Sequence, residues 1–378
     1  MPTRRTFLLG AAAIAVGAAL PVVSRATASA ATTLPVTIVN NTGQFANTSI
    51  WAYIVGNDAS GRQVVSRGDG VTIPVTPSLN GPSGFADLSI PMNASGGTTL
   101  TLPNMSGRIY FSINQKLQFK VVGANALQFP AGWVSTDPSF GVLHDWIEFT
   151  FNTSGMFCNT TMVDMFGIPL QIQLSGASQQ TTGTLVPGGR AAIFDGIRAQ
   201  AGYGSLVLAN GTRVIAPGHG IEAGLFSSTY YDGYVNQAWS KYAGTDFDIA
   251  INGVTFAGRV SGTNLVFSNG GGSFAKPTTK DVFFCAGALA PPPGAAGPVA
   301  AQLGAAFNRS TVLTHPQQPV TDPAQFYTDP TTNHYARIIH QNTANGKNYG
   351  FPFDDVEGFS SFIQDLSPNG MTLTLTPF

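Results

Sequence analysis

Short apolar runs, each bounded by turn residues, recur from residue 36 to residue 174. Examples are LPVTIVNNTG, GRIYFSI, WIEFTFN and MFGIPLQIQL, with Gly, Asn, Ser and Pro between the runs. Strand-length segments at this spacing predict an antiparallel sandwich or barrel. We therefore assign residues 31–185 to a β-rich domain.

Beyond residue 186 the apolar positions take a helical spacing. The segments GGRAAIFDGIRAQ and SSTYYDGYVNQAWSKYAG are predicted helices, the second with Ser227 or Ser228 as its cap and Gly244 as its stop. Strand-like runs follow, then the helical segments VAAQLGAAFNRS and NHYARIIHQNTANG, and finally the alternating strand MTLTLTPF. We assign residues 186–340 to a mixed α/β domain and expect a strand within 341–378 to return to the first domain. The predicted fold class is α+β with β-structure dominant.

The first thirty residues have the features of an export signal. Arg4 and Arg5 precede an apolar run over residues 7–23, and ASA at 28–30 forms a small-residue cleavage site. The run is short and interrupted by Pro21, which argues against a transmembrane span. Paired arginines are typical of the twin-arginine route. We predict that residues 1–30 are cleaved and that the mature protein is secreted, extracellular and not bound to a membrane.

Charge is sparse along the chain. Of 378 residues only 10% are charged, and the formal net charge is −1. The long-range field that a nucleic-acid or anionic-membrane binder needs is therefore missing. A surface wetted by Ser, Thr, Asn and Gln suits an uncharged polymer such as a polysaccharide. We expect a monomer that binds no nucleic acid.

The cysteines and histidines give no sign of a metal site. Cys158 and Cys285 fit either one disulfide in an oxidising compartment or two buried thiols, and we favour the disulfide. The five histidines show no HxxxH spacing and the cysteines no CxxC spacing. We therefore expect no metal and no other cofactor.

The strand HDWIEFTFN, residues 144–152, is predicted to have two different faces, since alternate residues of a strand point to opposite sides. One face is mostly apolar and directed to the core: Asp145, Ile147, Phe149 and Phe151. The other combines an aromatic ring, an acid, a hydroxyl and an amide, a set suited to sugars: His144, Trp146, Glu148, Thr150 and Asn152.

A hairpin brings a second acid toward Glu148. With Ser154-Gly155 at the turn and a second strand over residues 157–166, Glu148 would face Met162, and Trp146 would face Asp164. Glu148 and Asp164 would then be diagonal neighbours, about 7–8 Å apart. Inverting glycosidases hold their carboxyl groups about 6.5–9.5 Å apart and retaining ones about 5–5.5 Å. The pattern predicts an inverting pair, with Glu148 as an acid whose pKa is raised by Trp146 and apolar neighbours, and Asp164 as the base. The alternative is that both are solvent-facing strand residues without a chemical role.

Several segments resemble known families. EFTFN with VDMFGIPLQI, and the later YGFPFDDV, resemble motifs of thaumatin-like proteins. The fuller resemblance is to glycoside hydrolase family 64, secreted bacterial β-1,3-glucanases with a thaumatin-like fold. EFTFNTSGMFCNTTMVDMFG, YYDGYVNQAWSKY, AAFNRS, NHYARIIH and YGFPFDDV are similar to segments of that family, in the family's order. The resemblance covers nearly all of residues 35–378.

This resemblance implies an inverting endo-β-1,3-glucanase that acts on curdlan, laminarin and fungal cell-wall glucan and releases laminaripentaose. The glucan would lie in a wide groove between a β-barrel domain and an α/β domain. The family's acid falls on Glu148 and its base on Asp164, with sugar contacts on Thr150 and Asn152. Phe157 would be a further sugar contact, at a position where the family has a tryptophan. The alternative is a thaumatin-like glucan-binding or antifungal protein that holds the polymer without cutting it.

Other polar residues have both a functional and a structural interpretation. Asp137, Asp354 and Asp355 would either line the cleft or anchor turns and loops. His219 lies near Glu222 in a Gly-rich loop, where we favour a structural role. No GxSxG and no GxxxxGK[ST] occurs, so neither a nucleophile elbow nor a phosphate loop of that type is expected.

Overall fold

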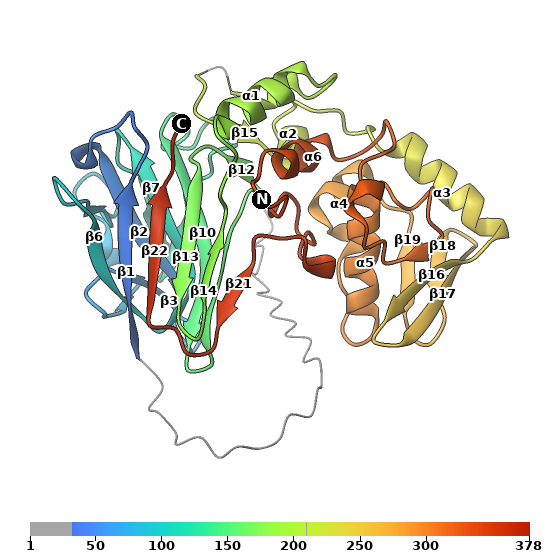
Figure 1. Cartoon of the computed structure of the whole chain (residues 1–378), viewed down its shortest axis with the longest axis horizontal. Helices are drawn as coiled ribbons and strands as arrows, with labels where there is room; N and C mark the ends of the chain where they lie inside the picture. The colour runs from blue at the N-terminus through green and yellow to red at the C-terminus, as the bar shows by residue number, and fades with distance from the viewer. Residues whose placement is uncertain (1–31, 209) are drawn as a thin grey trace, which may run out of the picture. The chain divides into compact units, whose positions relative to one another are not determined.

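Two facing sheets form the β-rich part of the computed structural model, which describes residues 32–208 and 210–378. The predicted export signal lies outside the described residues. The first sheet has the strand order β14-β13-β22-β1-β6. Its strands are β1 (Thr33–Asn40), β6 (Thr98–Pro103), β13 (Leu170–Ser175), β14 (Gln179–Thr182) and β22 (Gly370–Leu375). The final strand β22 pairs with β1 in parallel and with β13 antiparallel (Figure 1).

The second sheet has eight strands, in the order β21-β11-β10-β7-β2-β3-β4, with β5 paired to β2. These strands are β2 (Ile50–Asn57), β3 (Gln63–Ser66), β4 (Ile73–Pro74), β5 (Ile90–Pro91), β7 (Met105–Ile113), β10 (Leu143–Asn152), β11 (Gly155–Thr160) and β21 (Ile363–Asp365). Apolar side chains of both sheets form one buried cluster, which includes Val36, Ile109, Phe149 and Leu373. The prediction of a sandwich is therefore confirmed, with β1 and β22 as a parallel pair within it.

A mixed region follows the sandwich strands. Its sheet, β19-β18-β17-β16-β20, contacts helices α3 and α5. The elements are α3 (Asp232–Gly244), β16 (Phe247–Ile251), β17 (Val254–Ser261), β18 (Asn264–Phe267), β19 (Gly272–Ala275), α5 (Ala296–Asn308) and β20 (Gln317–Gln318). The prediction of an α+β fold dominated by β-structure is confirmed. The thaumatin-like label stays a prediction.

Shorter elements connect these regions. Helix α1 (Gly189–Ala199) packs on α6 (His334–Gln341), and α2 (Pro217–Glu222) packs on α4 (Thr279–Phe284). The remaining strands form two small pairs, β8 (Lys120–Val122) with β9 (Ala126–Gln128), and β12 (Met165–Phe166) with β15 (Val214–Ile215). Single 3-10 turns occur at Asn47–Ser49, Pro77–Leu79, Gly204–Leu206, Gly287–Leu289, Pro323–Gln325 and Val356–Gly358.

The predicted helices are present, but one of them begins late. Helix α3 starts at Asp232 and not after Ser227 or Ser228. The backbone N–H of Tyr231 donates to Thr279 Oγ1 at 2.8 Å, so this segment is held by α4 as a turn. Helix α6 starts as predicted from its sequence, with Asn333 Oδ1 accepting from the N–H of Ala336 at 3.1 Å.

A second buried cluster extends across the predicted boundary at residue 185. It joins Tyr53, Tyr110 and Trp146 of the eight-stranded sheet to Ile193 and Phe307 of the later helices. The described residues belong to one compact unit. The division into domains 31–185 and 186–340 stays a prediction.

The expected disulfide is wrong. Cys158 and Cys285 are both free and buried. Cys158 lies in the sandwich core, whereas Cys285 lies in a separate small cluster with Ala305, Ala336 and Phe351. Burial raises the pKa of the Cys158 thiol to about 12. Both thiols therefore serve as small apolar core groups. In the described part of the chain, no helix has the length and apolar character to span a bilayer.

Candidate active site

Strand β10 has the two predicted faces only from Ile147 onward, because His144 at its start, expected on the sugar-handling face, is fully buried. Ile147, Phe149 and Phe151 are buried in the sandwich core. Glu148 and Thr150 are half-buried and Asn152 is exposed on the opposite face. The alternation of a strand therefore places Glu148 outside the sandwich core, as expected.

The prediction that Trp146 contacts sugar is wrong. Trp146 is 1% exposed, with its ring 5.1 Å from that of Tyr110, and the Arg108 guanidinium lies over it at 4.6 Å. The second buried cluster covers this end of the sheet, and alternation along one strand cannot reveal such a cover. Trp146 was predicted as a sugar contact, but its side chain is a core group beneath the site.

The predicted hairpin register is also wrong, by three residues. Glu148 pairs with Asn159, Thr150 with Phe157 and Asn152 with Gly155, and β11 ends at Thr160. The turn is tighter than expected because Asn152 Oδ1 accepts from the N–H of Ser154 at 2.7 Å. Asp164 consequently lies in the segment between β11 and β12, and not on the strand beside Glu148.

Arg108 nevertheless brings the two acids together. It lies opposite Glu148 on the neighbouring strand β7. Its Nε and Nη2 donate to Glu148 Oε1 at 3.2 and 3.0 Å, and the same Nη2 lies 3.7 Å from Asp164 Oδ2. Glu148 Oε1 and Asp164 Oδ2 are therefore at most about 6.7 Å apart. This limit includes the retaining separation of about 5–5.5 Å and reaches only the lower edge of the inverting range of about 6.5–9.5 Å. The structure brings Glu148 and Asp164 to one guanidinium, and inversion stays a prediction.

The backbone next to Arg108 requires glycine. A Cβ at Gly107 would lie 2.1 Å from the carbonyl oxygen of Val55, because β7 and β2 approach closely there. This pairing fixes the strand that presents Arg108. Arg108 also donates from Nη1 to the Tyr110 hydroxyl at 3.2 Å. Burial on its own lowers the pKa of Arg108, but the tyrosine and the two carboxylates raise it above its usual value, so the arginine stays charged.

Asp164 has a second neighbour that can carry a positive charge, His219 of helix α2. His219 Nε2 lies 2.8 Å from Asp164 Oδ1, and Nδ1 lies 3.0 Å from Glu222 Oε2. Lys280 Nζ contacts the other oxygen of Glu222 at 2.8 Å. Burial on its own lowers the pKa of His219, but the two carboxylates raise it above 6.5. The contact with His219 lowers the pKa of the Glu222 carboxyl to about 2.

The predicted sugar contacts lie on the same face as Glu148. Thr150 and Phe157 are paired across β10 and β11, and both are half-buried. The Thr150 and Ser106 hydroxyl oxygens are 2.7 Å apart. Asn159 Nδ2 donates to Glu148 Oε2 at 3.5 Å. Asn152 lies further along, at the exposed end of the hairpin. The structure therefore groups Thr150 and Phe157 near Glu148 and leaves Asn152 at the margin.

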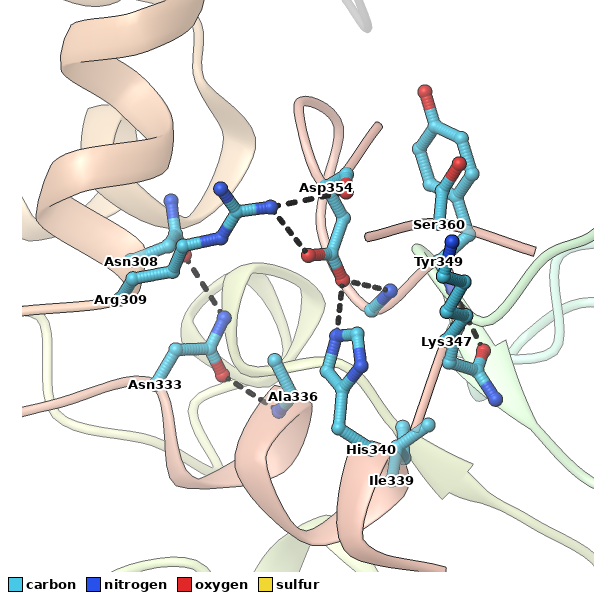
Figure 2. A network of polar contacts seen from close by, with 12 residues as sticks. Asn308, Arg309, Asn333, Ala336, Ile339, His340, Lys347, Tyr349, Asp354 and Ser360 are labelled. Carbon is cyan, nitrogen blue, oxygen red and sulfur yellow. Dashed lines mark hydrogen bonds and ion pairs between the residues drawn. The ribbon is translucent and has the colours of Figure 1, made fainter. Parts of the chain in front are cut away.

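Of the two roles considered for Asp354, lining the cleft or anchoring a loop, the structure shows the second. Its side chain is fully buried between two cationic groups (Figure 2). Its oxygens accept from Arg309 Nη2 at 3.3 Å and from the N–H of Gly350 at 2.9 Å, and Oδ2 lies 2.7 Å from His340 Nε2. The loop that it closes begins with Tyr349, whose carbonyl oxygen accepts from the N–H of Met162 at 2.9 Å. Burial, then Asp355 and Glu148, raise the pKa of Tyr349, which places this loop within the electrostatic reach of the candidate site.

Asp137 has a turn role. Its oxygens accept from the N–H groups of Ala131 and Ser139 at 3.0 and 2.8 Å. This turn closes the loop that carries Trp133, which stacks on His219 with ring centroids 4.0 Å apart. Asp137 thus acts on the site through the loop that it shapes.

A cavity of about 600 Å³ lies beside the Asp354 cluster. Its lining includes Arg309, Tyr327, Arg337, His340 and Asp354, and neither Glu148 nor Asp164. The wide groove implied by the resemblance stays a prediction. Within residues 32–208 and 210–378, no three His, Cys, Asp or Glu side chains are grouped so as to hold a metal ion.

Sequence reasoning missed Arg108 and underrated His219. Arg108 is the one charged residue of the strand MSGRIYFSI, which was a signal in the sequence. Its partner Glu148 lies forty residues further along the chain, so the contact itself could not be predicted. The pairing of His219 with Glu222 was readable from their spacing within one helix, whereas its contact with Asp164 was not.

Glu148 and Asp164 are two partly exposed carboxylates close together, and most glycoside hydrolases use such a pair of acids. A family model described as "Beta-1,3-glucanase" matches residues 32–375, and the chain belongs to this family, glycoside hydrolase family 64. A glucan endo-1,3-β-glucosidase of Arthrobacter sp. (strain YCWD3) is 36% identical over 389 residues, which span 98% of this chain and 70% of that protein.

Solved structures show the same similarity. A laminaripentaose-producing β-1,3-glucanase in complex with laminaritetraose has a TM-score of 0.85 at 39% identity, over 92% of this chain and 99% of that one. A β-1,3-glucanase domain from Clostridium beijerinckii has a TM-score of 0.80 at 28% identity, over 92% and 98% of the two chains.

Proposed function

We propose that this protein is a secreted endo-β-1,3-glucanase that hydrolyses its substrate with inversion of configuration. The observation that carries the proposal is the meeting of Glu148 and Asp164 at Arg108 Nη2. Membership of the β-1,3-glucanase family supports the substrate class. The laminaripentaose product of a relative supports the same product here.

The environments of the two acids support different roles. Asp164 is 14% exposed and lies between the cations His219 and Arg108, which favour its ionised form, so it acts as the base. Glu148 is 32% exposed, contacts one cation, and is the acid that solvent and substrate reach more easily. Its expected apolar pocket beside Trp146 is not what the structure shows.

The reaction is a single displacement. Asp164 Oδ2 takes a proton from water, and the water oxygen attacks the anomeric carbon from the face opposite the leaving sugar. The glycosidic C–O bond breaks as Glu148 transfers its proton to the leaving oxygen. Glu148 ends as a carboxylate and Asp164 as a carboxylic acid. The proton returns through solvent before the next turnover.

The test is release of reducing sugar from laminarin and curdlan by wild type, Glu148→Gln and Asp164→Asn. Each variant is expected to lose about 10²–10⁴-fold in kcat, because one proton transfer is removed. Glu357→Gln and Asp195→Asn make the same chemical changes at exposed carboxylates and are the controls. A wild type that binds curdlan and releases nothing would instead support the binding-protein alternative.

Inversion has its own measurement. Proton NMR of fresh hydrolysate is expected to show the α-anomer first, and the β-anomer first would contradict single displacement. Chromatography of the same hydrolysate is expected to show laminaripentaose as the main product.

Export is proposed from residues 1–30. Fused to a reporter that folds in the cytoplasm, this segment is expected to direct export, and replacing Arg4 and Arg5 by lysine is expected to abolish it. Export that persists without both arginines would point to the general route. Size-exclusion chromatography tests the expected monomer.

A further inference from the structure

His219 lies between two carboxylates. Its Nε2 is 2.8 Å from Asp164 Oδ1, and its Nδ1 is 3.0 Å from Glu222 Oε2. An ionised carboxylate can only accept hydrogen bonds, and a neutral imidazole has a single N–H to donate. Both contacts are satisfied together only when the ring carries a proton on each nitrogen. The raised pKa of His219, in which the two carboxylates outweigh burial, agrees with this geometry.

Aromatic rings hold the imidazole in place. The ring of Trp133 stacks on it at 4.0 Å and 19°, and Phe284 meets it edge-on at 5.0 Å. The His219 side chain is 6% exposed. A cation over the face of a tryptophan is stabilised further when water is excluded. The packing therefore favours one ring orientation and the charged form of the ring.

This arrangement orients Asp164. Because His219 engages Oδ1, the other oxygen, Oδ2, is the one that lies toward Arg108 and hence toward Glu148. We propose that His219 is a positioning residue for hydrolysis: held as an imidazolium by Glu222, it fixes Asp164 with Oδ2 directed at the site of water attack and keeps that carboxylate ionised. The inference rests on the proposed role of Asp164 as the base.

The charges around His219 determine how pH acts on it. Asp164 and Glu222 face the ring directly, Lys280 of α4 acts through Glu222, and Arg108 of β7 acts through Asp164. Removing the His219 charge raises the pKa of Asp164, so the acid limb of kcat/KM moves to higher pH. Removing the Glu222 charge lowers the pKa of His219, so the imidazolium is lost at a lower pH.

The first experiment reads the ring directly and needs no substrate. NMR of the ¹⁵N-labelled histidine ring in the wild-type protein at pH 7 is expected to show both nitrogens of His219 protonated. Glu222→Gln keeps an acceptor for Nδ1 and removes its charge at a half-exposed position, so the deprotonation midpoint is expected to move down by about one pH unit. A neutral ring in the wild type at pH 7 would overturn the inference, whether or not the protein cleaves glucan.

The second experiment uses laminarin hydrolysis. His219→Gln keeps an N–H for Asp164 without the charge, and we expect kcat to fall about tenfold and the acid limb to rise by about one pH unit, with KM little changed. His315→Gln is the matched control, because His315 Nδ1 contacts the Thr314 hydroxyl and not the site. If His219→Gln does not fold, Glu222→Gln supplies the pH profile. Activity lost without any shift of either limb would show that His219 is only structural.

Discussion

The protein contains two clusters of the same composition, each with an aspartate between a histidine and an arginine. Asp164 lies 2.8 Å from His219 and 3.7 Å from Arg108. Asp354 lies 2.7 Å from His340 and 3.3 Å from Arg309. The distances alone do not separate a catalytic group from a structural one.

The surroundings do separate them. The Asp354 side chain is fully buried, and one of its oxygens also accepts from the backbone N–H of Gly350, so the cluster closes a loop. Asp164 is partly exposed, and the arginine beside it also holds a second carboxylate, Glu148. A charge cluster supports chemistry when a second acid and solvent reach it. The same set of groups, with its carboxylate fully buried and bonded to the backbone, supports the fold.

The largest expected contrast is between Asp164→Asn and Asp354→Asn. Asp164→Asn removes the base, and we expect a loss of about 10²–10⁴-fold in kcat with little change in stability. Asp354→Asn leaves the buried Arg309 guanidinium and the half-buried His340 ring without their shared carboxylate, and the free energy of unfolding is expected to fall by about 3–5 kcal/mol. Urea unfolding and laminarin hydrolysis of both variants test this. Asp354→Asn with full stability and no activity would place it in the reaction.

A smaller contrast concerns the two arginines. Arg108→Lys retains a charge but not the fork that contacts both carboxylates, and we expect kcat to fall about 10- to 100-fold through misplacement of the acids. Arg309→Lys is expected to lower stability and to leave kcat per folded molecule unchanged. Equal kinetic effects in the two variants would contradict the distinction.

The smallest contrast is in the dependence of stability on pH. Burial alone lowers the pKa of His340, but Asp354 raises it above its usual value, as the carboxylates do for His219. The stability from a raised histidine is complete below the unfolded pKa of about 6.5 and is lost as pH rises through the folded value. We expect the free energy of unfolding to decline above pH 6.5, and to decline less in His340→Gln. Urea titrations at a series of pH values check this, and parallel curves would refute it.

Much of the framework was readable from the chain. The apolar runs gave the sandwich strands, and alternation in HDWIEFTFN separated the core face from the face of Glu148. These are local properties, set by the period of a strand. The carboxylate pair itself came from the resemblance and from composition, since charged residues are rare in this segment.

The errors share a physical cause. The predicted register was wrong because the Asn152 side chain accepts a hydrogen bond from the N–H of Ser154, which makes the turn of the hairpin shorter. The prediction for Trp146 failed because residues distant in the sequence pack over its end of the sheet. Arg108 and His219 were missed as partners of Asp164 because contacts between distant segments have no local signature. Tertiary packing decided each of these points.

The position of β22 has a consequence for biosynthesis. It lies between β1 and β13, so two strands made long before it have no ladder joining them until residues 370–375 emerge. Every other described element is translated before this strand can dock. The five-stranded sheet is therefore completed only after all its other strands have been made, and a chain stalled before residue 370 would expose two unpaired strand edges to aggregation.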